Sequence, residues 1–182
     1  MNVNKRSTQI KKLTIAGVCF ALCMVLPLFI GQIPEIGMAL SPMHIPVLIA
    51  GFVIGPIYAA VVGFLAPLIR FMLFGMPPMP NAIAMSFELA TYGIVSGIMY
   101  KILPKKLIYL YVSLITAMLA GRIVWGIARV VMLGLVEVPF SMELFIGGAF
   151  VGAVPGIILH IVVVPPIVIA LKKAGLMLNA KD

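Results

Sequence analysis

Long apolar stretches with almost no charge are the feature that most restricts how this chain can fold. The stretch from Leu107 to Leu135, for example, carries only two charged side chains, Arg122 and Arg129. A hydrocarbon core of about 30 Å takes roughly 20 helical residues to cross, so this stretch is long enough for one transmembrane helix. Charged residues make up 10% of the chain, whereas a soluble domain has about a quarter. The sequence therefore predicts an integral membrane protein.

The connections between these stretches predict an all-α bundle of six transmembrane helices, a single domain over residues 1–182. Three prolines between residues 75 and 81 prevent a helix there, because each removes a backbone donor. Gly55-Pro56 indicates a tight turn, and the stretch before it is too short to cross the membrane alone. The expected spans are about 13–31, 43–54, 57–74, 82–103, 107–135 and 144–171. They leave no room for a fused soluble domain.

The basic residues predict the orientation of the bundle. With the N-terminus in the cytoplasm, the outer connections carry Glu35, Glu137 and Glu143 and no Lys or Arg, as the positive-inside rule requires. The ten basic residues on the cytoplasmic side are then Lys5, Arg6, Lys11, Lys12, Lys101, Lys105, Lys106, Lys172, Lys173 and Lys181. We expect a multi-pass protein of the cell membrane with both termini in the cytoplasm. The net charge of +8 needs no nucleic-acid partner, although some lysines can touch anionic lipid headgroups.

Catalytic and metal-binding motifs are absent from the sequence. There is no G-x-x-x-x-G-K-[ST], H-E-x-x-H or G-x-S-x-G run, and the only Asp is the last residue. Cys19 and Cys23 share one apolar run without a histidine at metal-ligand spacing, so we expect them to be buried apolar side chains. We predict no catalytic residue, no metal and no cofactor. If the protein's work consumes ATP, a partner hydrolyses it.

Apart from Lys101 at the cytoplasmic end of its span, four charged residues lie inside the expected spans: Arg70, Glu88, Arg122 and Arg129. Each charge at the bilayer centre costs roughly 2.5 to 3.5 kcal/mol, so such residues normally face a polar cavity or one another. Arg122, Trp125 and Arg129 follow an i, i+3, i+7 spacing and line one helix face. Three arginines and one glutamate sum to +2, a sign that favours an anionic or strongly hydrogen-bonding ligand.

The expected depths of these residues converge on the outer half of the membrane. Tyr92 follows Glu88 by one helical turn, and His44 and Asn81 begin their spans on that side. A pocket open to the outside is the simplest explanation, with arginine binding a carboxylate or phosphate and aromatic rings forming a flat wall. Arg122 or Arg129 would hold the anion, while Glu88 would orient an arginine or accept ligand hydroxyls. The candidate substrate-binding residues are Arg122, Arg129, Trp125, Glu88, Arg70, Asn81, Tyr92 and His44.

A structural alternative stays open for the same charges. Glu88 can pair with one arginine as a bridge while another arginine extends to the outer headgroups. His160, deep in an apolar span, is expected to bond a neighbouring helix. Small residues four apart, such as Gly93 and Gly97, predict close helix packing inside the bundle.

Three segments carry a resemblance to a known family. They are Met43-His-Ile-Pro-Val-Leu-Ile-Ala-Gly-Phe, Gly63-Phe-Leu-Ala-Pro-Leu-Ile-Arg70, and Gly75-Met-Pro-Pro-Met followed by Ala84-Met-Ser-Phe-Glu-Leu-Ala-Thr-Tyr-Gly93. With these segments the chain resembles the S-component of energy-coupling factor (ECF) transporters over nearly the whole six-span layout. Its pattern is nearest the pantothenate type.

The resemblance implies a receptor that captures a vitamin or related micronutrient outside the cell. It would dock on a transmembrane coupling subunit driven by two ATP-binding cassette (ABC) ATPases, and topple in the lipid bilayer to release its substrate inside. The alanine-rich docking motif of the family corresponds here to Gly17 and Ala21. The connections 32–41 and 75–81 would be gates over the pocket.

Three other functions remain compatible with the sequence. The chain could be a stand-alone secondary transporter in which Glu88 couples transport to protons or Na⁺. It could be an S-component for another vitamin, such as riboflavin or a pyridoxine-type compound. It could also be a structural subunit whose charges hold a larger membrane complex together, which predicts no small-molecule binding.

Overall fold

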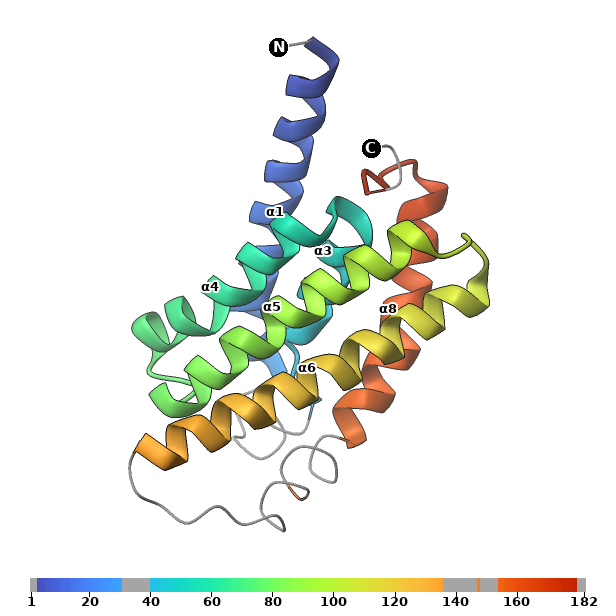
Figure 1. The fold of residues 1–182 in the computed structure, drawn as a ribbon. Helices are drawn as coiled ribbons and strands as arrows, with labels where there is room; N and C mark the ends of the chain where they lie inside the picture. Colours follow the sequence, from blue (N-terminus) through green and yellow to red (C-terminus); the bar gives the residue numbers. More distant parts are fainter. Residues whose placement is uncertain (1–2, 31–39, 136–146, 148–153, 180–182) are drawn as a thin grey trace.

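The computed structural model describes residues 3–30, 40–135, 147 and 154–179, and these residues form helices and short turns without any strand. The helices are α1 (Val3–Ile30), α3 (His44–Ile54), α4 (Pro56–Phe74), α5 (Met79–Ile102), α6 (Leu107–Leu135) and α8 (Val154–Lys173). α4, α5 and α6 lie side by side in one layer, with α1, α3 and α8 behind them (Figure 1). The all-α fold expected from the apolar stretches is confirmed for this part of the chain.

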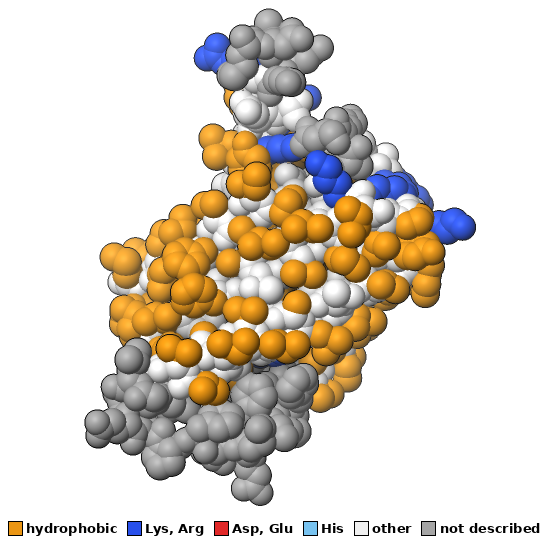
Figure 2. Space-filling model, in the orientation of Figure 1, with side chains coloured by type: hydrophobic (Ala, Val, Ile, Leu, Met, Phe, Trp, Pro, Cys, Tyr) orange, Lys and Arg blue, Asp and Glu red, His pale blue; other side chains and the backbone are white. Residues whose placement is uncertain are grey.

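Five of the described helices are long and apolar enough to cross a membrane, namely all except α3. α3 has 11 residues, so it resembles the short second span expected from the sequence. α8 begins at Val154, and the start of the expected last span, 144–153, lies almost wholly outside the described residues. A crossing number of six therefore remains a prediction. Apolar side chains cover the visible face of the bundle, while Lys and Arg gather at one end (Figure 2).

Glycines allow α5 to approach its neighbours closely. A Cβ atom at Gly93 would come within 2.7 Å of the Ala59 backbone in α4, and one at Gly97 within 2.6 Å of Pro56. In α4 itself, a Cβ at Gly63 would meet the Leu89 carbonyl. Contacts this short exclude any larger side chain. The predicted role of these small residues in packing within the bundle is confirmed.

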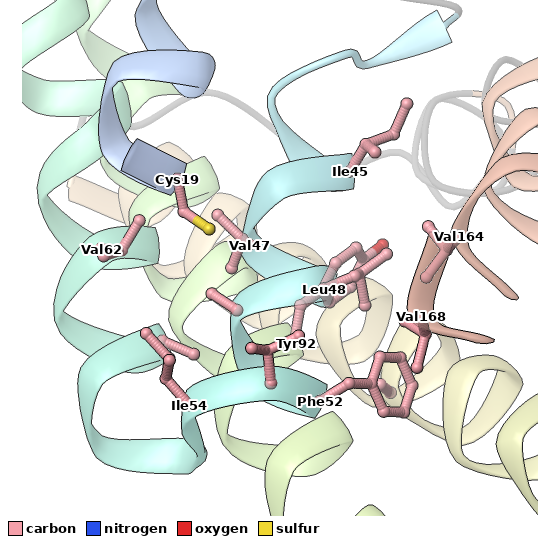
Figure 3. Packing of buried hydrophobic residues seen from close by; sticks show 14 of the residues in the cluster. Cys19, Ile45, Val47, Leu48, Phe52, Ile54, Val62, Tyr92, Val164 and Val168 are labelled. Atoms are coloured by element: carbon pink, nitrogen blue, oxygen red, sulfur yellow. The ribbon is translucent and has the colours of Figure 1, made fainter. Parts of the chain in front are cut away.

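The apolar core is centred on α3. Cys19 of α1 is directed toward Val47 of this helix, whereas Val164 and Val168 of α8 lie on its other side, near Leu48 and Phe52 (Figure 3). Cys19 is nearly buried and Cys23 is fully buried, as the sequence predicts. α3 thus links α1 and α8, which lie far apart in the sequence, and it fixes the inner wall of the bundle.

A short C-terminal segment closes the end of the bundle at which α3 stops. The amides of Leu178 and Asn179 both donate to the Val53 carbonyl, each over 2.8 Å. The buried Asn179 side chain donates through Nδ2 to the carbonyls of Gly51, at 3.2 Å, and Gly97, at 2.9 Å. Gly55 has a φ of 96°, which explains why glycine is needed in the turn between α3 and α4. The start of α1, the α5–α6 connection and the end of α8 lie toward this same end (Figure 1).

Candidate functional site

Five buried polar side chains from four helices meet at the opposite end of α3. We call this set the polar cluster: His44 of α3, Glu88 and Tyr92 of α5, Arg122 of α6 and His160 of α8. Arg122 is 7% exposed and the other four are 1% exposed. Buried polar groups are stable only when they are bonded to one another or to a ligand, so the partners of each atom decide what the cluster can do.

Glu88 is the centre of the polar cluster. Its Oε1 atom lies 3.2 Å from Arg122 Nη1 and accepts a hydrogen bond from the Tyr92 hydroxyl at 3.0 Å. His44 Nε2 lies 3.6 Å from the same oxygen. Glu88 therefore fixes the position of the Arg122 guanidinium, and Tyr92 restrains Glu88 in turn.

The packing of α5 against α6 makes room for this arrangement. A Cβ atom at Gly121 would overlap the ring of Tyr92, so only glycine fits opposite that ring. Tyr92 lies one turn after Glu88 on the same helix face. Gly121 thus leaves room for the Tyr92 ring, so that the Tyr92 hydroxyl can donate to Glu88.

The two histidines of the polar cluster share one backbone acceptor. His44 Nδ1 lies 3.0 Å and His160 Nε2 lies 3.4 Å from the Ser41 carbonyl oxygen, and the two rings are stacked with centroids 5.6 Å apart. His160 was expected to bond a neighbouring helix; its hydrogen bond goes instead to Ser41, which precedes α3, while its ring stacks on His44 of that helix. Because a carbonyl oxygen only accepts, each of these ring nitrogens must carry the proton. In a neutral ring, His160 Nδ1 is then an acceptor, whereas His44 Nε2 lies 3.6 Å from the Glu88 carboxylate oxygen.

Three nitrogen atoms of the polar cluster have no hydrogen-bond partner among the described residues: Arg122 Nε, His44 Nε2 and His160 Nδ1. Leaving such a buried group unbonded costs about 1 to 3 kcal/mol. Arg122 Nε is always a donor and His160 Nδ1 accepts in a neutral ring, whereas His44 Nε2 already faces the Glu88 carboxylate. A ligand with one strong acceptor and a hydroxyl or amide donor would satisfy Arg122 Nε and His160 Nδ1.

Arg70 does not belong to the polar cluster. Its Nη1 donates to the Met24 carbonyl of α1 at 2.7 Å, and its guanidinium lies 5.1 Å from the centre of the Phe74 ring. Arg70 is buried, so neither contact resembles a side chain extended toward headgroups. The structure assigns this arginine to the junction of α1 and α4.

Arg129, Trp125 and Asn81 are half-buried and make separate contacts. The Arg129 guanidinium lies 5.6 Å from the Trp125 ring centre, one turn away on α6. Asn81 Nδ2 lies 3.4 Å from the Met85 sulfur. Of the eight residues predicted from the sequence, the structure thus brings together four, namely His44, Glu88, Tyr92 and Arg122.

This separation changes the local charge. The formal charges of Arg122 and Glu88 cancel, whereas the sum over all four membrane-embedded charges is +2. A ligand in the polar cluster is therefore selected by hydrogen-bond pattern as much as by charge. The sequence did not identify the Ser41 carbonyl, since any residue provides a backbone acceptor, and it gave His160 only a structural role.

Residues 11–168 match the sequence model of the family described as ECF transporter, substrate-specific component. The chain belongs to this family. No curated protein and no solved structure matches it. As an ECF substrate-specific component, it is a multi-pass membrane protein and a substrate-binding subunit of a transporter. Such components bind small-molecule substrates, associate with the partner proteins of the ECF module and are generally not enzymes.

The face of α1 that carries Gly17 and Ala21 remains open in this ECF component. No heavy atom of the described residues lies within 4 Å of a Cβ built on Gly17, and Ala21 is exposed. This contrasts with Gly63 of α4, Gly93 and Gly97 of α5 and Gly121 of α6, which are in close contact with a neighbouring helix. Both small residues are therefore exposed at the surface of the described bundle.

Proposed function

We propose that the chain captures a vitamin with one carboxylate and several hydroxyl or amide groups, and that pantothenate is the substrate to test first. The observation that supports this most directly is the unpartnered Arg122 Nε, on a guanidinium that Glu88 already holds from another side. A carboxylate oxygen is the acceptor that an arginine binds most strongly.

The pattern of donors and acceptors supports the same ligand. Pantothenate has a carboxylate for Arg122, and two hydroxyl groups and an amide N–H, any of which can donate to His160 Nδ1. Tyr92 and Trp125 would flank the apolar part of the substrate. His44 is the first residue of α3, whose other end lies toward the end of α8 with Lys172 and Lys173 (Figure 1). With the lysines in the cytoplasm, the polar cluster is nearer the outer face of the cell membrane.

Delivery into the cell would require partners. We propose that a transmembrane coupling subunit docks on the open face of α1 at Gly17 and Ala21, where small residues allow a second helix to approach. Two ABC ATPases would then supply the energy. In this proposal the purified chain alone binds substrate but does not accumulate it.

Equilibrium binding of radiolabelled pantothenate to the purified full-length protein tests the substrate assignment. Arg122→Gln should weaken binding at least about 100-fold, because one partner of a buried charge-assisted bond is lost. Arg129→Gln is the matched control and should change affinity less than about threefold. Panthenol, in which an alcohol replaces the carboxylate, should compete at least about tenfold less well.

Three outcomes would overturn parts of this proposal. Equal affinities of the two arginine variants would remove Arg122 from the anion site. Binding of riboflavin or a pyridoxine-type compound instead of pantothenate would replace the substrate. Uptake into proteoliposomes that contain only this chain, abolished by an uncoupler, would instead indicate a secondary transporter.

A further inference from the structure

A cavity of about 450 Å³ lies at the end of the bundle opposite the polar cluster. We call it the lysine cavity, because Lys105, Lys106, Lys172 and Lys173 line it together with apolar side chains of α6 and α8, such as Leu110 and Val168. The first residue of α6, Leu107, also lines it. Leu107 and Arg122 are 15 residues apart on α6, so about 22 Å along the helix separate the two sites.

The positive charge in the lysine cavity is not neutralised within the described part of the chain. Glu88 is the single acidic residue there, and it belongs to the polar cluster. The lysines contact backbone carbonyls instead: Lys105 Nζ donates to the Tyr100 carbonyl, and Lys172 Nζ donates to the Lys105 carbonyl at 3.2 Å. These bonds hold two ammonium groups near each other, which an anion would stabilise.

The pKa of Lys105 is lowered, as expected of a partly buried ammonium group close to a second positive charge. Partial burial lowers it first, and the neighbouring charge of Lys172 lowers it further. Lys105 also lies over the Tyr100 ring, with Nζ 4.1 Å from the ring centre, so its side chain is held against the wall of the cavity. A fixed and partly desolvated ammonium group binds an anion more strongly than a freely moving surface lysine.

The position of the lysine cavity identifies the kind of anion. It lies where α5 ends, α6 begins and α8 ends, at the edge of the membrane-spanning segments. The nearby side chains Ile102, Leu107 and Ile108 are more than half exposed, which is expected of residues that face lipid tails. An occupant of this site would therefore meet ammonium groups and apolar side chains at once.

We propose that the lysine cavity binds an anionic phospholipid, with its phosphate between Lys105 and Lys172 and its acyl chains along the apolar surface of α6 and α8. Charge complementarity supports this occupant, and the apolar wall distinguishes it from a small soluble anion. The proposal does not depend on which substrate the polar cluster binds.

Native mass spectrometry of the full-length protein tests the proposal. Protein purified in detergent is mixed with equal amounts of phosphatidylglycerol and phosphatidylcholine with the same acyl chains. We expect one phosphatidylglycerol to be retained preferentially. Because each lysine near a membrane surface contributes about fivefold to binding of an anionic lipid, Lys105→Gln with Lys172→Gln should reduce this retention about thirtyfold.

Two further variants separate the site from general surface charge. Lys11→Gln with Lys101→Gln removes the same number of charges from exposed lysines that do not line the cavity, and should leave retention unchanged. Ile169→Trp keeps every charge but narrows the cavity, and should also reduce retention. If the double glutamine variant does not purify, Ile169→Trp and the charge-conserving Lys105→Arg with Lys172→Arg, which should retain the lipid, decide the matter.

Three results would overturn the proposal. Equal retention of phosphatidylglycerol and phosphatidylcholine would show that charge plays no part. Equal losses in the two double variants would assign the effect to general surface charge. Displacement of phosphatidylglycerol by inorganic phosphate alone would indicate a site for a small soluble anion.

Discussion

The polar cluster and the lysine cavity are two concentrations of charge that follow opposite rules. In the polar cluster, Glu88 and Arg122 have opposite charges and are buried against each other. In the lysine cavity, four side chains of the same sign lie at the membrane edge and are mostly exposed. The difference shows that the depth of a charged side chain in the bundle determines what kind of partner it needs. A charge inside the bundle needs a protein partner, whereas at its end water and headgroups can serve.

Removing one charge from each region tests this difference most strongly. Glu88→Ala leaves Arg122 buried without its counter-ion, so we expect the free energy of unfolding to fall by about 3 to 5 kcal/mol. Lys172→Ala should change it by less than about 0.5 kcal/mol. Thermal unfolding of both variants in the same detergent measures the two effects. Equal changes would mean that burial does not distinguish the two regions.

A smaller effect is expected from filling the space that the Tyr92 ring occupies. Gly121→Ala places a methyl group against that ring, so the ring must move away from Glu88, at a cost of about 1 to 3 kcal/mol in unfolding free energy. Gly17→Ala is the matched control, because nothing lies near a Cβ there, and it should be neutral or slightly stabilising. A neutral Gly121→Ala, measured by the same unfolding assay, would show that the polar cluster tolerates displacement of Tyr92.

The smallest expected effect concerns pH and the lysine cavity. The pKa of Lys105 is lowered from 10.5 in the folded protein, so protonated Lys105 destabilises the fold. This destabilisation is fully present below the lowered pKa and disappears as pH rises through it toward 10.5. Stability should therefore rise slightly over this window, and less so in Lys105→Gln. An identical pH profile for the two proteins would contradict the desolvation of this lysine.

The sequence was sufficient for the helices and for part of the polar cluster. Long apolar stretches can satisfy their backbone only as helices in a membrane, which predicts α4, α5 and α6. The prediction that no helix forms between residues 75 and 81 was wrong at its end, since α5 begins at Met79 and tolerates Pro80 in its first turn, where a backbone N–H has no helical acceptor. α1 begins at Val3 rather than near residue 13, because its polar first turns continue the helix beyond the apolar stretch. Glu88 and Arg122 could be linked because buried opposite charges attract each other.

Other parts of the site could not be predicted for definite physical reasons. An arginine side chain is long and flexible, so its place in the sequence does not decide which acceptor Arg70 reaches; in the structure that acceptor is the Met24 carbonyl. Hydrogen bonds to backbone carbonyls leave no pattern in the sequence. Examples are the bond from His44 to the Ser41 carbonyl and the bond from the Asn179 side chain to the Gly51 carbonyl. They depend on how helices far apart in the chain pack together.

The shortness of α3 has a consequence for any solute that reaches His44. Eleven residues extend about 16 Å, roughly half of a hydrocarbon core, and α3 ends at the turn into the membrane-spanning α4. The imidazole of His44 is therefore separated from the turn into α4 by about half the thickness of a hydrocarbon core. A solute bound there has lost most of its hydration shell, so selectivity would depend on whether the polar cluster can replace the water that each candidate leaves behind.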